Sequence, residues 1–156
     1  MARRSDSRRW LIQSAGDGAH SMGLADTIFG GSTEQDRQKY AILLSAGPED
    51  APVANNAFSY ALEFADAGYG VKVFLDGQAT KWPGAFAENP DLPFHHDWER
   101  IRDLGLLAGA CGYCANAFDA TAACENSGIE LLSDEMSHAP AVARLADEGY
   151  ELLTIG

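Results

Sequence analysis

The sequence predicts a single α/β domain whose sheet is mostly parallel, has five strands and carries helices on both faces. Short apolar runs alternate with amphipathic stretches from Tyr40 onwards, which is typical of parallel strands joined by right-handed helical crossovers. The 156 residues suffice for one hydrophobic core, and the apolar content of 46% is that of a globular protein. No apolar run approaches the roughly 18 residues of a membrane-spanning helix. We therefore expect a small soluble domain.

The elements follow from local patterns. Short apolar runs predict strands at residues 40–44, 71–75, 106–110, 129–132 and 150–155. The first helix is expected to begin at Asp50, with Pro52 in its first turn, and to end at Gly68. Further helices are expected at 97–104, 114–126 and 137–148. Residues 77–97 contain three prolines and no clear periodicity, so they are expected to form a long connection.

The charge of the chain argues against a nucleic-acid partner. The net charge is −12, and acids and arginines cancel within residues 1–37, so the whole excess lies in residues 38–156. Such a surface repels phosphate backbones. The few lysines on an acidic surface also suit a protein kept soluble at high salt.

Residues 1–37 differ from the rest and are expected to form an N-terminal extension to the domain at 38–156. Arg8-Arg9 and the apolar residues after them resemble a twin-arginine export signal. Asp17, His20 and Asp26 interrupt the apolar segment that a working signal needs. We therefore expect a cytoplasmic protein, with export as the alternative.

Thiol chemistry at Cys111 is the chemistry that the sequence favours. Cys111 is expected where the third strand ends and a helix begins, and free backbone N–H groups at such a position lower the pKa of a thiol. Cys114 is one turn further along and is expected to reach back as a resolving thiol. Cys124 falls late in an apolar helix and is expected to belong to the core.

A substrate pocket is expected around the cysteines, because sites in parallel sheets lie at the carboxyl ends of the strands. Its expected members come from three strand ends and are Ser45, Gly47, Asp76, Gly112 and Tyr113. Gly112 is expected to leave the approach to Cys111 open. No glycine pattern for binding pyrophosphate and no GxxxxGK[ST] motif occurs, so nucleotide binding is disfavoured.

We expect neither a metal nor a cofactor. A zinc site needs four ligands. The candidates in the sequence are Cys111, Cys114 and Cys124 with one of His95, His96 or His138. No second CxxC unit and no HxxxH unit supports such a site.

Three segments together resemble the DsrE/DsrF-like sulfur-relay family. They are the opening strand with its Gly47-Pro48-Glu49-Asp50 turn, the second strand Gly70 to Gly77, and the cysteine segment Ala110-Cys111-Gly112-Tyr113-Cys114-Ala115. The resemblance covers roughly residues 39–156. It implies a Rossmann-like three-layer domain that assembles as trimers or hexamers. It also implies that Cys111 accepts sulfane sulfur from a donor protein as a persulfide and passes it to an acceptor protein.

One departure from the family concerns the acceptor pocket. The family often has Arg-Gly soon after the cysteines, where this chain has Phe118-Asp119. Any catalysis would be of the sulfurtransferase type.

Two other classes of function stay open. Cys-Gly-Tyr-Cys also resembles the active site of a dithiol oxidoreductase, although such sites follow the first strand of their core. A third class is a non-catalytic assembly or regulatory module whose cysteines only sense the redox state. A carrier should survive the loss of Cys114, an oxidoreductase should not, and a Cys111 out of reach of reagents would favour the module.

Overall fold

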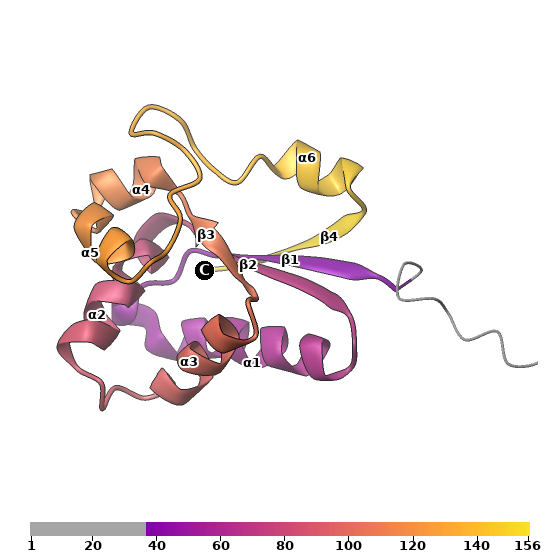
Figure 1. The fold of residues 1–156 in the computed structure, drawn as a ribbon, viewed down its shortest axis with the longest axis horizontal. Coiled ribbons are helices and arrows are strands. Elements are labelled where there is room, and N and C mark those ends of the chain that lie inside the picture. Colours follow the sequence, from indigo (N-terminus) through magenta and orange to yellow (C-terminus); the bar gives the residue numbers. More distant parts are fainter. Residues whose placement is uncertain (1–36) are drawn as a thin grey trace, which may run out of the picture. The chain divides into compact units, whose positions relative to one another are not determined.

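The computed structural model describes residues 37–156, which are organised by a parallel sheet (Figure 1). Its strands are β1 (Lys39–Leu44), β2 (Gly70–Leu75), β3 (Leu107–Ala110) and β4 (Tyr150–Ile155), in the order β3-β2-β1-β4. Leu44 at the end of β1 lies beside Leu75 of β2 and Ile155 of β4, so these strands end together at one edge. The predicted α/β class with a parallel sheet is confirmed.

The prediction of five strands is wrong, because residues 129–132 make only an isolated bridge between Leu131 and Ala110. The N–H of Ala110 donates to Glu130 O at 2.9 Å, and the N–H of Leu132 donates to Ala110 O at 2.9 Å. The neighbouring strand β3 has only four residues, and its Gly109 has a φ of 144°. The register between β2 and β3 also shifts beside this glycine, and this irregular backbone limits the pairing with residues 129–132 to the bridge at Ala110.

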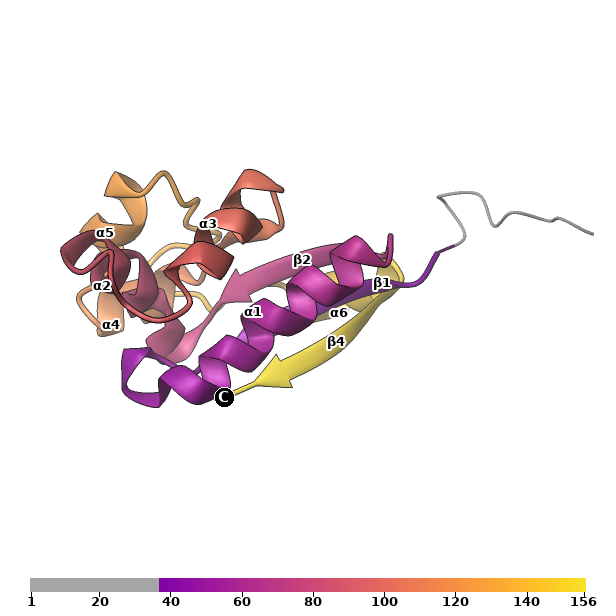
Figure 2. The ribbon, with the colours of Figure 1, turned by 90° about the horizontal axis from the view of Figure 1, so that it is seen from below.

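Helices cover both faces of the sheet (Figures 1 and 2). One face carries α1 (Ala51–Asp66) and α3 (His95–Asp103), and the other carries the short α6 (Val142–Asp147). Phe58 of α1 and Ile101 of α3 belong to the main core, whereas Leu145 of α6 packs in a smaller cluster with Phe74 of β2. The first helix lies close to its predicted bounds.

The segment 77–97, predicted as a long connection without clear periodicity, contains short helices. It contains a 3-10 helix, η3 (Gly77–Lys81), and an α-helix, α2 (Trp82–Glu88). A second short 3-10 helix, η2 (Pro48–Asp50), lies elsewhere in the chain and precedes α1. Pro83 lies in the first turn of α2, where a missing N–H costs nothing. The rings of Trp82 and Phe86 stack at 5.0 Å and are buried against Phe58. Aromatic burial, rather than periodicity, holds this short helix in place.

Two predicted helices are shorter in the structure. The helix expected at 114–126 is divided into α4 (Gly112–Ala117) and α5 (Thr121–Asn126), and Asp119 between them has a φ of 56°. The helix expected at 137–148 is reduced to α6. Pro140 falls inside that expected range, and its ring and missing N–H are incompatible with a helix interior.

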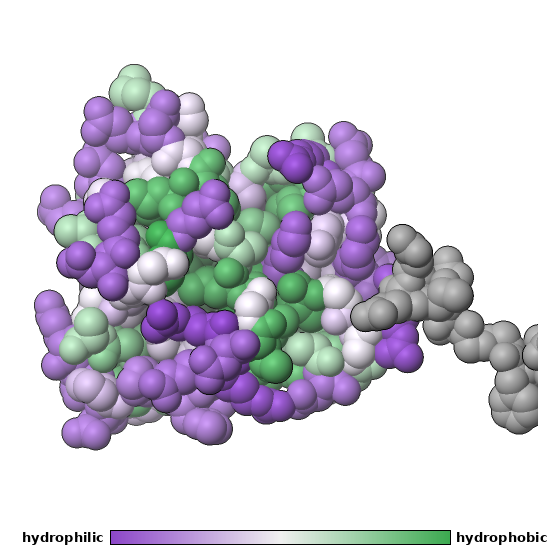
Figure 3. All heavy atoms as spheres, viewed as in Figure 1, coloured by the Kyte–Doolittle hydropathy of each residue, from purple (hydrophilic) through white to green (hydrophobic). Residues whose placement is uncertain are grey.

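Apolar side chains gather in the middle of the face seen in Figure 1 and are bordered by hydrophilic ones (Figure 3). No helix within residues 37–156 is long and apolar enough to cross a membrane. The predicted N-terminal extension, with its resemblance to an export signal, lies almost wholly outside the described residues.

Candidate functional site

The candidate site lies at the carboxyl ends of β2 and β3, under the irregular segment that precedes α6. Cys111 directly follows β3, and its N–H donates to Leu75 O at the end of β2 (2.8 Å). It is the N-cap residue of α4, so Cys114 follows within the first turn of that helix. This is the location that the sequence predicts for the two thiols.

A histidine from the irregular segment joins the two cysteines. The Nδ1 atom of His138 lies 3.7 Å from Cys111 Sγ and 3.7 Å from Cys114 Sγ. The backbone N–H of Ala139 donates to Cys111 Sγ at 3.4 Å. Cys111 and Cys114 are only 1% and 6% exposed, whereas His138 is exposed. The thiols are thus covered, and the histidine connects them to the surface.

Asp76 holds the second thiol in its protonated form. Cys114 Sγ donates to Asp76 Oδ1 at 3.1 Å, and the N–H of Gly77 donates to the same oxygen at 2.8 Å. Burial, together with the hydrogen bond to the Asp76 carboxylate, raises the pKa of the Cys114 thiol to about 12. At neutral pH Cys114 is therefore a thiol and not a thiolate.

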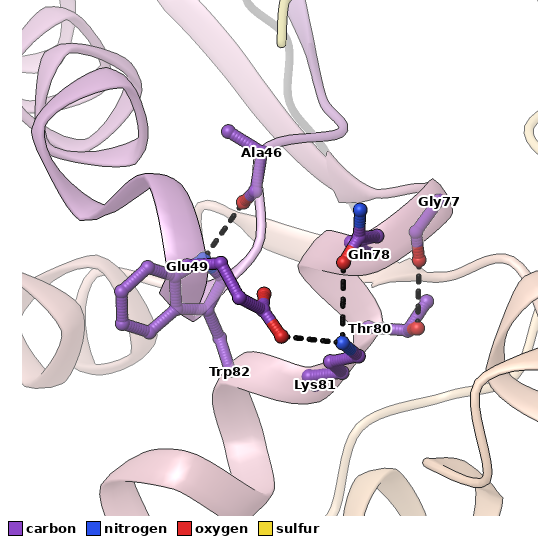
Figure 4. A network of polar contacts seen from close by, with 7 residues as sticks. All are labelled: Ala46, Glu49, Gly77, Gln78, Thr80, Lys81 and Trp82. Carbon is purple, nitrogen blue, oxygen red and sulfur yellow. Dashed lines mark hydrogen bonds and ion pairs between the residues drawn. The ribbon is translucent and has the colours of Figure 1, made fainter.

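A network of polar contacts behind Asp76 fixes the 3-10 helix that this residue caps (Figure 4). Trp82 Nε1 donates to Ala46 O at 2.9 Å, and Lys81 Nζ contacts Glu49 Oε1 at 2.6 Å. Thr80 Oγ1 donates to Gly77 O at 2.8 Å within the same turn. These contacts attach η3 to the turn after β1. They therefore hold the backbone next to Asp76 in place and fix the position of its carboxylate.

Gly112 has a different role from the predicted one. It is buried, and its N–H donates to Ser133 Oγ at 3.1 Å. A Cβ atom at this position would overlap the carbonyl oxygen of Ser133. The missing side chain therefore lets residues 133–139 pack onto the cysteine segment, instead of leaving the approach to Cys111 open.

Tyr113 and His138 form the exposed rim of the site. Their ring centroids lie 4.2 Å apart with an interplanar angle of 43°, and Tyr113 is 40% exposed. Sequence reasoning considered His138 only as one of three possible zinc ligands and missed its place beside both thiols. The sequence did contain one signal for this role, because His138 follows the fourth apolar run and was therefore expected near the end of a strand.

The other predicted pocket residues lie beside the site. Ser45 donates through its N–H to Ile155 O at 2.8 Å, and a Cβ on Gly77 would lie 3.4 Å from Ser45 Cβ, while a Cβ on Gly47 would meet Gln78. Both therefore pack on the 3-10 helix that Asp76 caps. Cys124 is buried in α5 with its thiol 3.5 Å from Thr80 O, as expected for a core residue.

The structure gathers three of the zinc ligands considered from the sequence, Cys111, Cys114 and His138, but not Cys124, His95 or His96. His95 stacks on Phe86 at 5.1 Å and lies 3.9 Å from Glu99, and His96 belongs to the same helix, α3. Cys124 belongs to the core. One atom each from Asp76, Cys111, Cys114 and His138 instead lie within 4.8 Å of one another. This set offers two soft thiol ligands, one imidazole and one carboxylate.

Phe118 and Asp119, the departure from the family pattern, form the turn between α4 and α5. Asp119 adopts a φ of 56°, in the left-handed region that glycine favours and that aspartate tolerates better than most residues. Lys81 Nζ lies 5.6 Å above the Phe118 ring. The backbone conformation that a glycine would favour is therefore kept without the glycine.

Comparison with known proteins identifies the family. A conserved protein of unknown function, BT1422 from Bacteroides thetaiotaomicron, superposes with a TM-score of 0.54 at 20% identity, over 76% of this chain and 95% of that one. This likeness shows the fold alone. No curated protein matches the chain. The model of the DsrE/DsrF-like family matches residues 38–155, and the chain therefore belongs to the DsrE/DsrF-like family.

Proposed function

We propose that the protein is a sulfur carrier that holds sulfane sulfur as a persulfide on Cys111. The observation that carries the proposal is the surroundings of Cys111 Sγ, which lies 3.7 Å from His138 Nδ1 and accepts a hydrogen bond from the Ala139 N–H. An imidazole at this position removes the thiol proton, and the N–H stabilises the negative sulfur. The DsrE/DsrF-like family is associated with sulfur relay.

The transfer occurs in two balanced displacements. The Cys111 thiolate attacks the outer sulfur of a donor persulfide, a new S–S bond forms, and the donor leaves as a thiolate. A thiolate of the acceptor protein then attacks the outer sulfur on Cys111, and Cys111 leaves as a thiolate. His138 takes the proton of Cys111 in the first step and returns it after the second.

Cys114 has a supporting role in this mechanism. Its pKa of about 12 keeps it protonated, and its hydrogen bond to Asp76 directs the proton away from Cys111. A neutral thiol beside the persulfide adds no negative charge that would oppose sulfur binding. Once it loses its proton, the Cys114 thiolate can attack the inner sulfur of the Cys111 persulfide, which forms a Cys111–Cys114 disulfide and releases the outer sulfur as hydrosulfide.

A second candidate is a non-catalytic regulatory module, and the 1% exposure of Cys111 favours it. The carrier proposal requires residues 133–139 to move aside when a donor docks, because His138 and Ala139 cover the thiol.

The carrier proposal includes a cytoplasmic location, where thiols stay reduced, and an assembly of three or six chains. Donor and acceptor proteins are its partners.

Intact-mass spectrometry after incubation with a sulfane-sulfur donor tests the proposal. We expect wild type, Cys114→Ala and the core control Cys124→Ala to gain one sulfur atom, and Cys111→Ala to gain none. A two-hydrogen loss on oxidation that needs Cys111 and Cys114, without any sulfur adduct, would instead indicate a dithiol oxidoreductase. No adduct and no oxidation would indicate a non-catalytic structural module.

A further inference from the structure

We propose that Asp76, Cys111, Cys114 and His138 form a tetrahedral site for a soft divalent cation, with Zn²⁺ as the fitting ion. Two thiolates, one imidazole and one carboxylate are ligands that zinc accepts in proteins. The four candidate ligand atoms lie within 4.8 Å of one another, and this is the one such group in residues 37–156. They come from the end of β2, the start of α4 and the segment before α6, so the fold and not the CxxC motif creates the set.

The distances already approach those of a zinc centre. A sulfur at about 2.3 Å and a nitrogen at about 2.1 Å from tetrahedral zinc lie about 3.6 Å apart. The two measured distances from His138 Nδ1 to the sulfur atoms are both 3.7 Å. The Cys114–Asp76 pair, at 3.1 Å, has to open slightly when its hydrogen bond is replaced by two bonds to the metal. The remaining pairs lie within 4.8 Å, so small movements bring all four atoms to the ion.

Outer contacts orient the ligands as in established metal sites. The N–H of Gly77 donates to Asp76 Oδ1, and the N–H of Ala139 donates to Cys111 Sγ. The Tyr113 ring lies against the His138 ring at 4.2 Å. The exposed His138 and the half-buried Asp76 provide the entry path, while both sulfur atoms are buried.

Metal binding and sulfur loading exclude each other in this arrangement. The ion replaces the two thiol protons, which pass to solvent, and forms two metal–sulfur bonds in their place. Cys111 then has no free thiolate with which to attack a persulfide. This consequence rests on the proposed function, whereas the metal site itself does not.

Titration of the reduced, metal-free full chain with Co²⁺ and then Zn²⁺ tests the site. We expect one Co²⁺ per chain, with a thiolate-to-cobalt charge-transfer band and the intense visible bands of four-coordinate cobalt, and displacement by Zn²⁺. Asp76→Asn and His138→Gln should each weaken metal binding by more than about tenfold. Loss of an outer-shell partner already weakens binding by about tenfold or more, and the loss of a direct ligand should cost more than that. Asparagine is also a good N-cap residue, and His138 is exposed, so both variants should fold.

The matched controls are Cys124→Ala and His95→Gln, which lie outside the cluster and should bind as wild type does. A six-coordinate cobalt spectrum without a thiolate band would overturn the proposal. So would a Co²⁺ affinity in Asp76→Asn and His138→Gln equal to that of wild type. Zinc-loaded protein should also gain no sulfur from a donor. If metal-free protein gains none either, the carrier function fails while the metal titration still decides the site.

Discussion

At the scale of single residues, the two cysteines of one motif have different neighbours, and these favour different protonation states. Cys111 accepts a hydrogen bond from the Ala139 N–H and faces an imidazole nitrogen. Cys114 faces the same nitrogen but donates to a carboxylate. An N–H donor stabilises a thiolate, and a neighbouring carboxylate destabilises one. The pair is therefore suited to one nucleophile and one neutral thiol.

The raised pKa of Cys114 predicts a loss of stability at alkaline pH. The folded thiol has a pKa of about 12 against an ordinary value of 9.0, so above about pH 9 the unfolded chain releases a proton that the folded chain keeps. The stabilisation is complete below pH 9 and is lost as the pH rises towards 12. In urea unfolding at increasing pH, the free energy of unfolding should fall less steeply with pH in Cys114→Ala than in wild type.

A graded comparison checks this prediction. Burial raises the pKa of Cys124 to about 11, so Cys124→Ala should reduce the slope less than Cys114→Ala does. An unchanged slope in Cys114→Ala would contradict the assigned pKa.

At the scale of elements, the site depends on the irregular segment 133–139 and on one glycine beneath it. Gly112 begins α4 and leaves room for the Ser133 carbonyl, and the same segment then brings His138 to the thiols. The segment is irregular partly because Pro140 prevents a longer α6. Close backbone packing thus sets the distance between histidine and sulfur.

Gly112→Ala should loosen this cover. The added methyl group would overlap the Ser133 carbonyl oxygen, so the segment must shift, at a cost of about 1–3 kcal/mol. We expect a lower urea midpoint and a faster reaction of the thiols with a disulfide reagent.

Gly84→Ala in α2 is the matched control, since its added Cβ meets only Ala123 Cβ, at 3.2 Å. It should keep the thiol reactivity of wild type. Equal reactivity in Gly112→Ala and wild type would show that residues 133–139 do not limit access.

At the scale of the whole molecule, charge repulsion opposes the folded state. Residues 38–156 carry the entire excess of −12, and few lysines are available to pair with it. The ion pairs that form are at the surface, such as Arg100 with Asp66 at 2.7 Å, and contribute little each. Unpaired acids on a compact surface repel one another.

Salt should therefore stabilise the protein. Raising sodium chloride from about 0.1 M to about 1 M shortens the screening length from about 10 Å to about 3 Å. We expect a higher free energy of unfolding in urea at the higher salt concentration. Neutralising three exposed acids, in Glu135→Gln, Asp147→Asn and Glu151→Gln combined, should reduce this increase. An increase of the same size in the triple variant would assign the effect to the apolar core instead.

Local patterns in the chain are sufficient for the class of fold and for the position of the Cys111 thiol. Apolar runs with a helical stretch between them predict parallel strands, and the capping residues around Asp50 and Gly68 place α1. The same alternation places Cys111 at a strand end. These features depend on neighbours in sequence, and so they can be predicted from it.

Long-range packing decides the rest. Asp76 and His138 lie 38 and 24 residues from Cys114 in the chain, and no periodicity indicates that their side chains meet at its sulfur. The number of strands depends on the irregular pairing of β3 beside Gly109, and the helix α2 depends on aromatic burial around Trp82. Local sequence specifies which face of an element is apolar, but which loops meet at a sheet edge depends on the packing of the whole domain.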